Sequence, residues 1–171
     1  MNTLRLMQTQ DIPNALSIIA QAQSYLAAQG VNQWQDGYPN EASTLSDIRL
    51  RQGYVWEEDA SIQAVITITF DGEPTYEPIY EGAWHSDAPY ACIHRIAISK
   101  ERRGTGLARA LLQAAEELIQ SRGFYAIRVD THRQNMPMQR LLTRHGFQPC
   151  GIIYLQDGSE RIAFDKALPC L

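Results

Sequence analysis

The stretch Arg102-Arg103-Gly104-Thr105-Gly106-Leu107-Ala108-Arg109, here called the basic loop, decides the fold prediction. An apolar run over residues 93–98 comes before it, and the apolar residues after it keep the spacing of an amphipathic helix over 107–120. A second apolar run follows over 124–129, after Gly123. The sequence therefore predicts a strand, a glycine turn, a helix and a second strand in succession.

The charge of the basic loop conflicts with its place at the start of a helix. A helix N-terminus carries unpaired N–H groups and partial positive charge, so acidic side chains are favoured in its first turn. Arg102, Arg103 and Arg109 stand there instead. A bound anion removes the conflict, because glycines let the backbone approach closely while amides and guanidinium groups supply positive charge. The basic loop is thus predicted to bind a diphosphate.

Composition and charge limit the class of protein. A chain of 171 residues with 44% apolar residues suits one domain, expected over residues 1–171. The net charge of −4 argues against nucleic acid as the main partner. Cys92, Cys150 and Cys170 form no C-x-x-C pair, which favours reduced thiols in a cytoplasmic protein. No apolar run has the length of a membrane span, so no membrane partner is expected.

The rest of the chain predicts helices and strands that end in an antiparallel hairpin. Asp157-Gly158 is a strong two-residue hairpin signal. Asn135 is a typical helix cap, and Gly146 closes the helix that it begins. The expected strands cover residues 4–7, 54–57, 62–70, 93–98, 124–129, 151–156 and 159–164, and the expected helices lie between Asp11 and Gly30 and over 43–52, 107–120 and 136–145.

With these elements placed, the chain resembles the GNAT superfamily of N-acetyltransferases. The family motif [Gln/Arg]-x-x-Gly-x-[Gly/Ala] is matched by residues 103–108, and an Asn that opens a helix closing in Gly-Phe is matched by Asn135 and Gly146-Phe147. The resemblance covers nearly the whole chain. It implies an α/β (α+β) fold with a mixed, mostly antiparallel central sheet, a parallel splayed strand pair, flanking helices and a C-terminal β-hairpin.

The resemblance also implies that acetyl-CoA is the cosubstrate, bound between the two splayed parallel strands. Its diphosphate would lie on amides of the basic loop, and its pantetheine would pair with the backbone of the preceding strand. Asn135 matches a family position near the cofactor. The implied cofactor-binding residues are Ile96, Ala97, Ile98, Arg103, Gly104, Thr105, Gly106, Leu107, Ala108, Arg109 and Asn135.

A dinucleotide site is the main alternative for the basic loop. Asp130 ends the next predicted strand, where a ribose-binding acid would stand. Three features argue against this alternative. Arg109 replaces the third glycine, residues 99–103 separate the strand from the first glycine, and the chain ends in a hairpin rather than a second nucleotide-binding half.

Acetyl transfer to an amine needs a base, donors that stabilise the tetrahedral intermediate, and a proton for the departing thiolate. Asp130 is the candidate base, and an acid here matches a glutamate of the ribosomal-protein N-terminal acetyltransferase branch. A carboxylate that caps the Thr131-His132 turn is the structural alternative. Relatives often carry a tyrosine as proton donor where this chain has Leu142. Water is one alternative proton source, and Tyr154 is the candidate side chain, with strand packing as its structural alternative.

Aromatic and acidic residues are candidates for the acceptor side. Trp34 and Tyr38 lie in the connection between the first two helices, which resembles the family's lid over the acceptor. Carboxylates over residues 71–90 alternate with aromatic residues, among them Trp84, an arrangement that would suit a cationic amine. A solvated loop that its aromatic residues pin to the body is the alternative.

The histidines add two further candidates. His94 and His132 could line the acceptor pocket or relay a proton, and a hydrogen-bonded structural role is the alternative for each. No histidine has metal-ligand spacing with a carboxylate or a cysteine, so no metal is expected.

The predicted function is acetyl-CoA-dependent acetylation of a primary amine, which could be a small amine, an amino acid or a peptide N-terminus. Direct transfer in a ternary complex is expected because no cysteine stands in a nucleophile context. The alternative is a catalytically weak acyl-CoA-binding sensor, which Leu142 permits; an enzyme for longer acyl groups is a third. Many relatives pair as dimers, so a homodimer is also considered.

Overall fold

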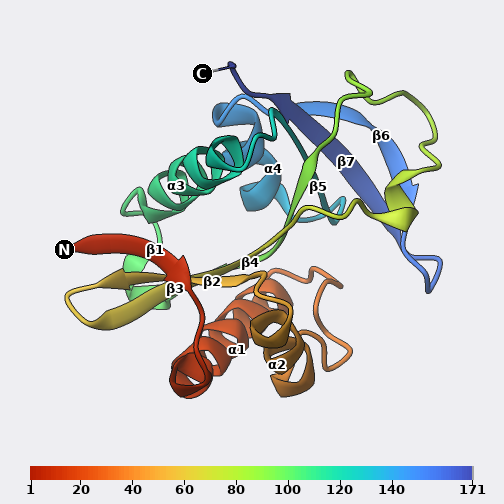
Figure 1. Cartoon of the computed structure of the whole chain (residues 1–171). Coiled ribbons are helices and arrows are strands. Elements are labelled where there is room, and N and C mark those ends of the chain that lie inside the picture. The colour runs from red at the N-terminus through yellow and green to blue at the C-terminus, as the bar shows by residue number, and fades with distance from the viewer. Residues whose placement is uncertain (171) are drawn as a thin grey trace. The chain divides into compact units, whose positions relative to one another are not determined.

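The computed structural model describes residues 1–170 and contains two compact units (Figure 1). The first unit comprises Met1–Ile68 and His94–Ala115, and the second comprises Thr69–Ile93 and the residues from Glu116 onward. Each unit is therefore built from two separate segments of the chain. The expectation of one domain over residues 1–171 stays a prediction.

Among residues 1–170, seven strands form a sheet with the hydrogen-bonded order β1-β2-β3-β4-β5-β7-β6. The strands are β1 (Asn2–Leu6), β2 (Gly53–Glu58), β3 (Ser61–Thr69), β4 (Ala91–Ile98), β5 (Ala126–Thr131), β6 (Gln148–Tyr154) and β7 (Glu160–Ala167). The pairs β1–β2, β2–β3, β5–β7 and β6–β7 are antiparallel, whereas β4 and β5 pair in parallel. The predicted mixed α/β fold with one parallel pair and a terminal hairpin is confirmed.

In the first unit, helices α1 (Ile12–Ala28) and α2 (Glu41–Arg49) lie on one face of β1–β3 (Figure 1). The apolar face of α1 packs on Val55 and Val65 of the strands, as its helical spacing predicted. The predicted start of α2 at Ser43 or Thr44 was wrong. Asn40 caps this helix because its side chain accepts from the Ser43 amide while the Ser43 hydroxyl accepts from the Asn40 amide.

In the second unit, β7 lies between β5 and β6, and helix α4 (Met136–Arg144) begins after its cap, Asn135. Helix α3 (Leu107–Ser121) contributes residues to both units. β5 begins two residues later than predicted and runs on through Asp130, which pairs with Ala163. No helix in the described part of the chain is both long and apolar enough to span a bilayer.

The terminal hairpin differs in its turn from the two-residue prediction. Residues 155–159 connect the two strands, and within them Leu155 donates to the Ser159 carbonyl and Gly158 donates to the Leu155 carbonyl, which closes a turn around residues 156–158. A three-residue turn of this kind is the next most common hairpin loop. The register of β6 also shifts between Pro149 and Gly151, which leaves Cys150 outside the regular ladder.

The segment between β3 and β4, residues 70–90, is here called the β3–β4 loop. It contains a short 3-10 turn, Pro74–Tyr76, and then forms a bridge between Tyr80 and Ile152 of β6 with hydrogen bonds of 2.9 and 2.7 Å. Gly82 lies against β6 so closely that a Cβ atom would meet the Cys150 carbonyl oxygen at 1.9 Å. The β3–β4 loop is therefore docked on β6 and not free in solvent.

Candidate active site

The basic loop lies in the first unit and has an open glycine turn. Gly104 and Gly106 have φ angles of 73° and 88°, a region in which a residue with a side chain is strained. No heavy atom lies within 4 Å of the Cβ position of either glycine, so conformation and not crowding requires glycine here. α3 begins directly afterwards at Leu107, and the amides of its first turn have no acceptor within the helix. The arrangement can bind an anion.

The arginines of the basic loop are not equally available to such an anion. Arg102 donates to Oε1 of Glu58 at 3.0 Å, and the Arg103 guanidinium carbon lies 4.4 Å from the centroid of the Tyr25 ring. Arg109, in the first turn of α3, is exposed. Arg102 and Arg103 thus have partners within the chain, whereas Arg109 is exposed, and the part of each guanidinium in binding an anion stays a prediction.

β4 leads into the basic loop and carries residues 96–98, which are predicted to contact pantetheine. Ala97 is buried in the core cluster of the first unit, and its two neighbours are half-buried. The parallel pairing with β5 ends at Cys92 among the described residues. Arg95 has a φ angle of 50°, which interrupts the extended strand. The pantetheine contact stays a prediction.

In the second unit, Asp130 is held by Tyr76, one of the aromatic residues over 71–90, which the sequence did not place beside Asp130. The Tyr76 hydroxyl donates to Oδ2 of Asp130 at 2.6 Å. Burial and the nearby carboxylate raise the pKa of Tyr76 well above its usual range, so the hydroxyl keeps its proton and acts as donor. Nothing in the local sequence predicts this contact, because it depends on the course of the β3–β4 loop.

The turn after Asp130 has its own acceptor. Nδ1 of His132 accepts from the Gln134 amide at 3.1 Å, which favours the neutral imidazole. Burial and the charge of Arg161 also lower the pKa of His132. Whether Asp130 acts as the base or caps this turn stays open.

Asn135 caps α4 as predicted, since its side-chain oxygen accepts from the Met138 amide at 3.2 Å. Its place near the cofactor stays a prediction. His94 is half-buried on β4, in the first unit. Its role at an acceptor site likewise stays a prediction.

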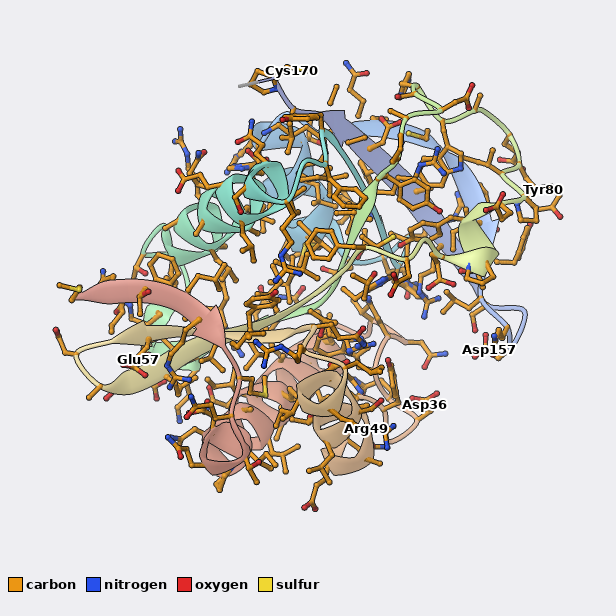
Figure 2. All side chains as sticks on the ribbon, in the orientation of Figure 1. Asp36, Arg49, Glu57, Tyr80, Asp157 and Cys170 are labelled. Atoms are coloured by element: carbon orange, nitrogen blue, oxygen red, sulfur yellow. The ribbon has the colours of Figure 1, made fainter. Side chains whose placement is uncertain are left out.

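Tyr154 and Asp130 are not brought together. Tyr154 is exposed, and its ring packs edge-on against Tyr80, labelled in Figure 2, with 5.3 Å between centroids. Tyr154 pairs with Glu160 of β7, and Asp130 pairs with Ala163 of the same strand, three residues further on. Two strand spacings and three residues of rise place their Cα atoms about 14 Å apart. The role of Tyr154 as proton donor to the thiolate stays a prediction.

The connection between α1 and α2 is anchored to β4 within the first unit. The Tyr38 hydroxyl accepts from the Arg95 guanidinium, which also donates to Asp47 at 2.6 and 3.2 Å. Trp34 is half-buried against the core cluster, whereas Tyr38 is exposed. Tyr38 is therefore the more accessible of the two predicted acceptor residues.

The contacts of Trp84 favour a structural role. Its indole N–H donates to the Tyr76 carbonyl at 2.8 Å, and the two rings lie 5.4 Å apart. The guanidinium carbon of Arg128 lies 4.2 Å from the Trp84 ring centroid and 4.0 Å from that of Tyr90. These contacts support the alternative in which aromatic residues pin the β3–β4 loop to the strands.

One group of potential metal ligands exists within residues 1–170. Ligand atoms of His85, Cys150 and Asp165 all lie within 4.8 Å of one another. The expectation of no metal considered only spacing along the chain, in which this group cannot be seen. His85 is 65 residues from Cys150 and 80 from Asp165.

Comparisons with known proteins agree with this geometry. Residues 19–147 match the model of the acetyltransferase (GNAT) family. A streptothricin acetyltransferase from Escherichia coli is 29% identical over 113 residues, covering 66% of this chain but only 63% of that protein. A GNAT-family acetyltransferase structure from Streptococcus agalactiae 2603 superposes with a TM-score of 0.90 at 36% identity, covering 98% of this chain and 96% of the other. A Salmonella typhimurium structure that holds its cofactor acetyl-CoA has a TM-score of 0.69 at 16% identity, with coverage of 98% and 94%.

Proposed function

The chain belongs to the acetyltransferase (GNAT) family of N-acetyltransferases, and from this premise we propose that it transfers an acetyl group from acetyl-CoA to a primary amine in a ternary complex. The observation that carries the proposal is the open turn of Gly104 and Gly106 at the start of α3. It offers a diphosphate unpaired amides and space at the same place.

In this proposal the first-turn amides of α3 and the exposed Arg109 bind the diphosphate of acetyl-CoA. Residues 96–98 of β4 bind its pantetheine, and Asn135 lies near the thioester end. The Salmonella relative with bound acetyl-CoA supports this choice of cosubstrate. The negative charge of the diphosphate suits both a helix N-terminus and a guanidinium group.

We assign the base to Asp130. Its carboxylate takes a proton from the ammonium group, after which the amine nitrogen attacks the acetyl carbonyl carbon. The tetrahedral intermediate then collapses and the C–S bond breaks, while the nitrogen releases its second proton to solvent and the thiolate takes up a proton from solvent. Tyr76 supports the assignment because its 2.6 Å hydrogen bond fixes the rotation of the carboxylate, as general-base catalysis requires.

The acceptor is proposed to be a small cationic amine. Glu77, Glu81 and Asp87 are exposed on the β3–β4 loop, and their negative charge favours a cation. The similarity to a streptothricin acetyltransferase supports a small molecule as acceptor. An acyl-CoA sensor is the second candidate, because the buried Leu142 leaves no proton donor at the family's tyrosine position.

The test is thiol release from acetyl-CoA against a panel of amines, amino acids and peptides. We expect turnover above background with at least one small amine, and a loss of at least about 100-fold in Asp130→Asn with CoA affinity preserved. Asp71→Asn, which changes an exposed acid of the β3–β4 loop, serves as the matched control. Tight CoA binding without turnover on any amine would instead support the sensor.

A further inference from the structure

The structure assigns a metal site to His85, Cys150 and Asp165 of the second unit, here called the His-Cys-Asp group, and we propose that it binds Zn²⁺. Nδ1 of His85 lies 2.7 Å from Oδ1 of Asp165 and 3.4 Å from Sγ of Cys150. None of these residues belongs to the basic loop, and none is given a step in acetyl transfer, although Cys150 packs in the same core cluster as Tyr76. The proposal is therefore independent of the acetyl-transfer proposal.

The separations of the ligand atoms suit a tetrahedral zinc ion. Zinc binds nitrogen and carboxylate oxygen at about 2.0–2.2 Å and sulfur at about 2.3 Å, so its ligand atoms lie about 3.3–3.6 Å apart. The distance from Sγ of Cys150 to Nδ1 of His85 is already in this range. The distance from Nδ1 to Oδ1 of Asp165 is that of a hydrogen bond, and it needs to open by about 0.6 Å to admit the ion.

The types of ligand select zinc over the common hard cations. Thiolate, imidazole and carboxylate together are a donor set for zinc, whereas Mg²⁺ and Ca²⁺ require oxygen ligands. Three protein ligands leave a fourth position for water. The side chain of His85 is 51% exposed and that of Asp165 only 10%, so the ion would reach the site from the His85 side.

The backbone holds the three ligands in place without help from a metal. The irregular register of β6 after Pro149 takes Cys150 out of the ladder. The His85 amide donates to Oδ2 of Asp165 at 2.8 Å, which orients the carboxylate while Oδ1 faces His85. Such a hydrogen bond to the second oxygen is typical of the support that metal-binding carboxylates receive. The close contact of Gly82 with the Cys150 carbonyl fixes the β3–β4 loop beside them.

Binding converts the Cys150 thiol to a thiolate and releases its proton to solvent. The ion would then link three chain segments: the β3–β4 loop, β6 and β7. The β3–β4 loop also carries Tyr76 and the exposed acids. Zinc would therefore stabilise the conformation in which this loop holds them. The proposal concerns binding of the ion alone and gives it no step in acetyl transfer.

The experiment measures metal binding to the full chain without acetyl-CoA. Equilibrium dialysis against Zn²⁺ should give one ion per chain, and Co²⁺ should give a thiolate-to-metal charge-transfer band. Cys150→Ser should abolish that band, and both Cys150→Ser and His85→Ala should weaken Zn²⁺ binding at least ten-fold. Cys170→Ser is the matched control, because Cys170 is exposed near the end of the chain (Figure 2). Cys170→Ser should bind Zn²⁺ as tightly as the unchanged protein does.

The proposal fails if the unchanged chain retains less than one zinc, or if both variants bind zinc as tightly as it does. Loss of binding in Cys170→Ser would show adventitious binding at an exposed thiol. Circular dichroism checks that each variant is folded. Should Cys150→Ser unfold, His85→Ala decides the matter, because its side chain is half-exposed and its loss leaves β6 and β7 intact.

Discussion

Tyr76 donates a 2.6 Å hydrogen bond to Asp130, although the two residues are 54 positions apart in the sequence. Tyr76 is fully buried in a cluster with Cys92, Ile153 and Ala163, so the donor has a fixed position. A protonated phenol held in this way restricts the carboxylate to one orientation. The proposed base is thus oriented by the β3–β4 loop and not by its own strand.

We predict that Tyr76→Phe lowers kcat about ten-fold and leaves CoA affinity unchanged, because the carboxylate loses its orienting donor. The variant should also lose about 1–3 kcal/mol of stability. Steady-state kinetics and CoA titration measure both effects, with Tyr80→Phe, an exposed tyrosine, as control. An unchanged kcat would contradict the positioning role. A loss of activity in Tyr154→Phe would support Tyr154 as the proton donor.

Gly106→Ala should weaken CoA binding at least ten-fold, since its methyl group enters the space proposed for the diphosphate. The variant should also lose about 1–2 kcal/mol of stability, because φ is 88°. Gly30→Ala is the matched control: its φ is 70°, and no heavy atom lies within 4 Å of its Cβ position either. It should show the same loss of stability with unchanged CoA affinity. Equal CoA affinity in both variants would remove the diphosphate from this turn.

We predict that Arg109→Ala mainly weakens CoA binding, whereas Arg103→Ala mainly lowers stability. Arg109 is exposed in the first turn of α3, so its loss should weaken CoA binding by about 1–2 kcal/mol, less at high salt. Arg103 stacks on Tyr25, so its loss should lower thermal stability and leave CoA affinity nearly unchanged. Isothermal titration at two salt concentrations distinguishes the variants. The opposite ranking of affinities would show that Arg103 turns toward the ligand.

Arg128→Met should destabilise the protein by about 2–4 kcal/mol, because the guanidinium lies between two aromatic rings and also donates to the Ser86 carbonyl. Arg122→Met is the control, since Arg122 is exposed and its guanidinium carbon lies over one ring, that of Phe70, at 4.8 Å. Its expected cost is about 0.5–1 kcal/mol. Urea unfolding compares the two. Equal costs would show that the second ring contact of Arg128 contributes nothing beyond a single one.

Stability should fall at alkaline pH because of buried thiols. Burial raises the pKa of Cys92 from 9.0 to about 12. Between these values the unfolded chain loses a proton that the folded chain keeps, so the free energy of unfolding decreases by at most about 1.4 kcal/mol per pH unit for this thiol. Below pH 8 its contribution is fully present.

The check is urea unfolding of Cys92→Ala between pH 8 and 11. Its stability should fall less steeply with pH than that of the unchanged chain. The remaining slope includes Cys150, whose pKa burial also raises to about 12. Cys170→Ala, at an exposed thiol, should keep the original slope. If the free energy of unfolding falls equally with pH in all three proteins, Cys92 has the same pKa in the folded and the unfolded chain.

Local features of the fold were predictable because they depend on neighbours in the sequence. The glycine turn of the basic loop, the start of α3 at Leu107 and the cap of α4 at Asn135 are where the pattern places them. Element ends were less accurate where two local signals compete. At α2 the Asn40 and Ser43 pair prevailed over Ser43 alone, and in the hairpin a three-residue turn prevailed over Asp157-Gly158.

The amino-acid sequence by itself determined the helix and strand order, the open turn of the basic loop and the family to which the chain belongs. Periodicity, glycine and caps act over a few residues, so they can be recognised without a structure. Only the tertiary structure decided that Tyr76 meets Asp130, that Arg103 stacks on Tyr25, and that His85 joins Cys150 and Asp165. These contacts join residues far apart in the chain. They form because the β3–β4 loop and the helices pack on particular strands, and no local pattern encodes that packing.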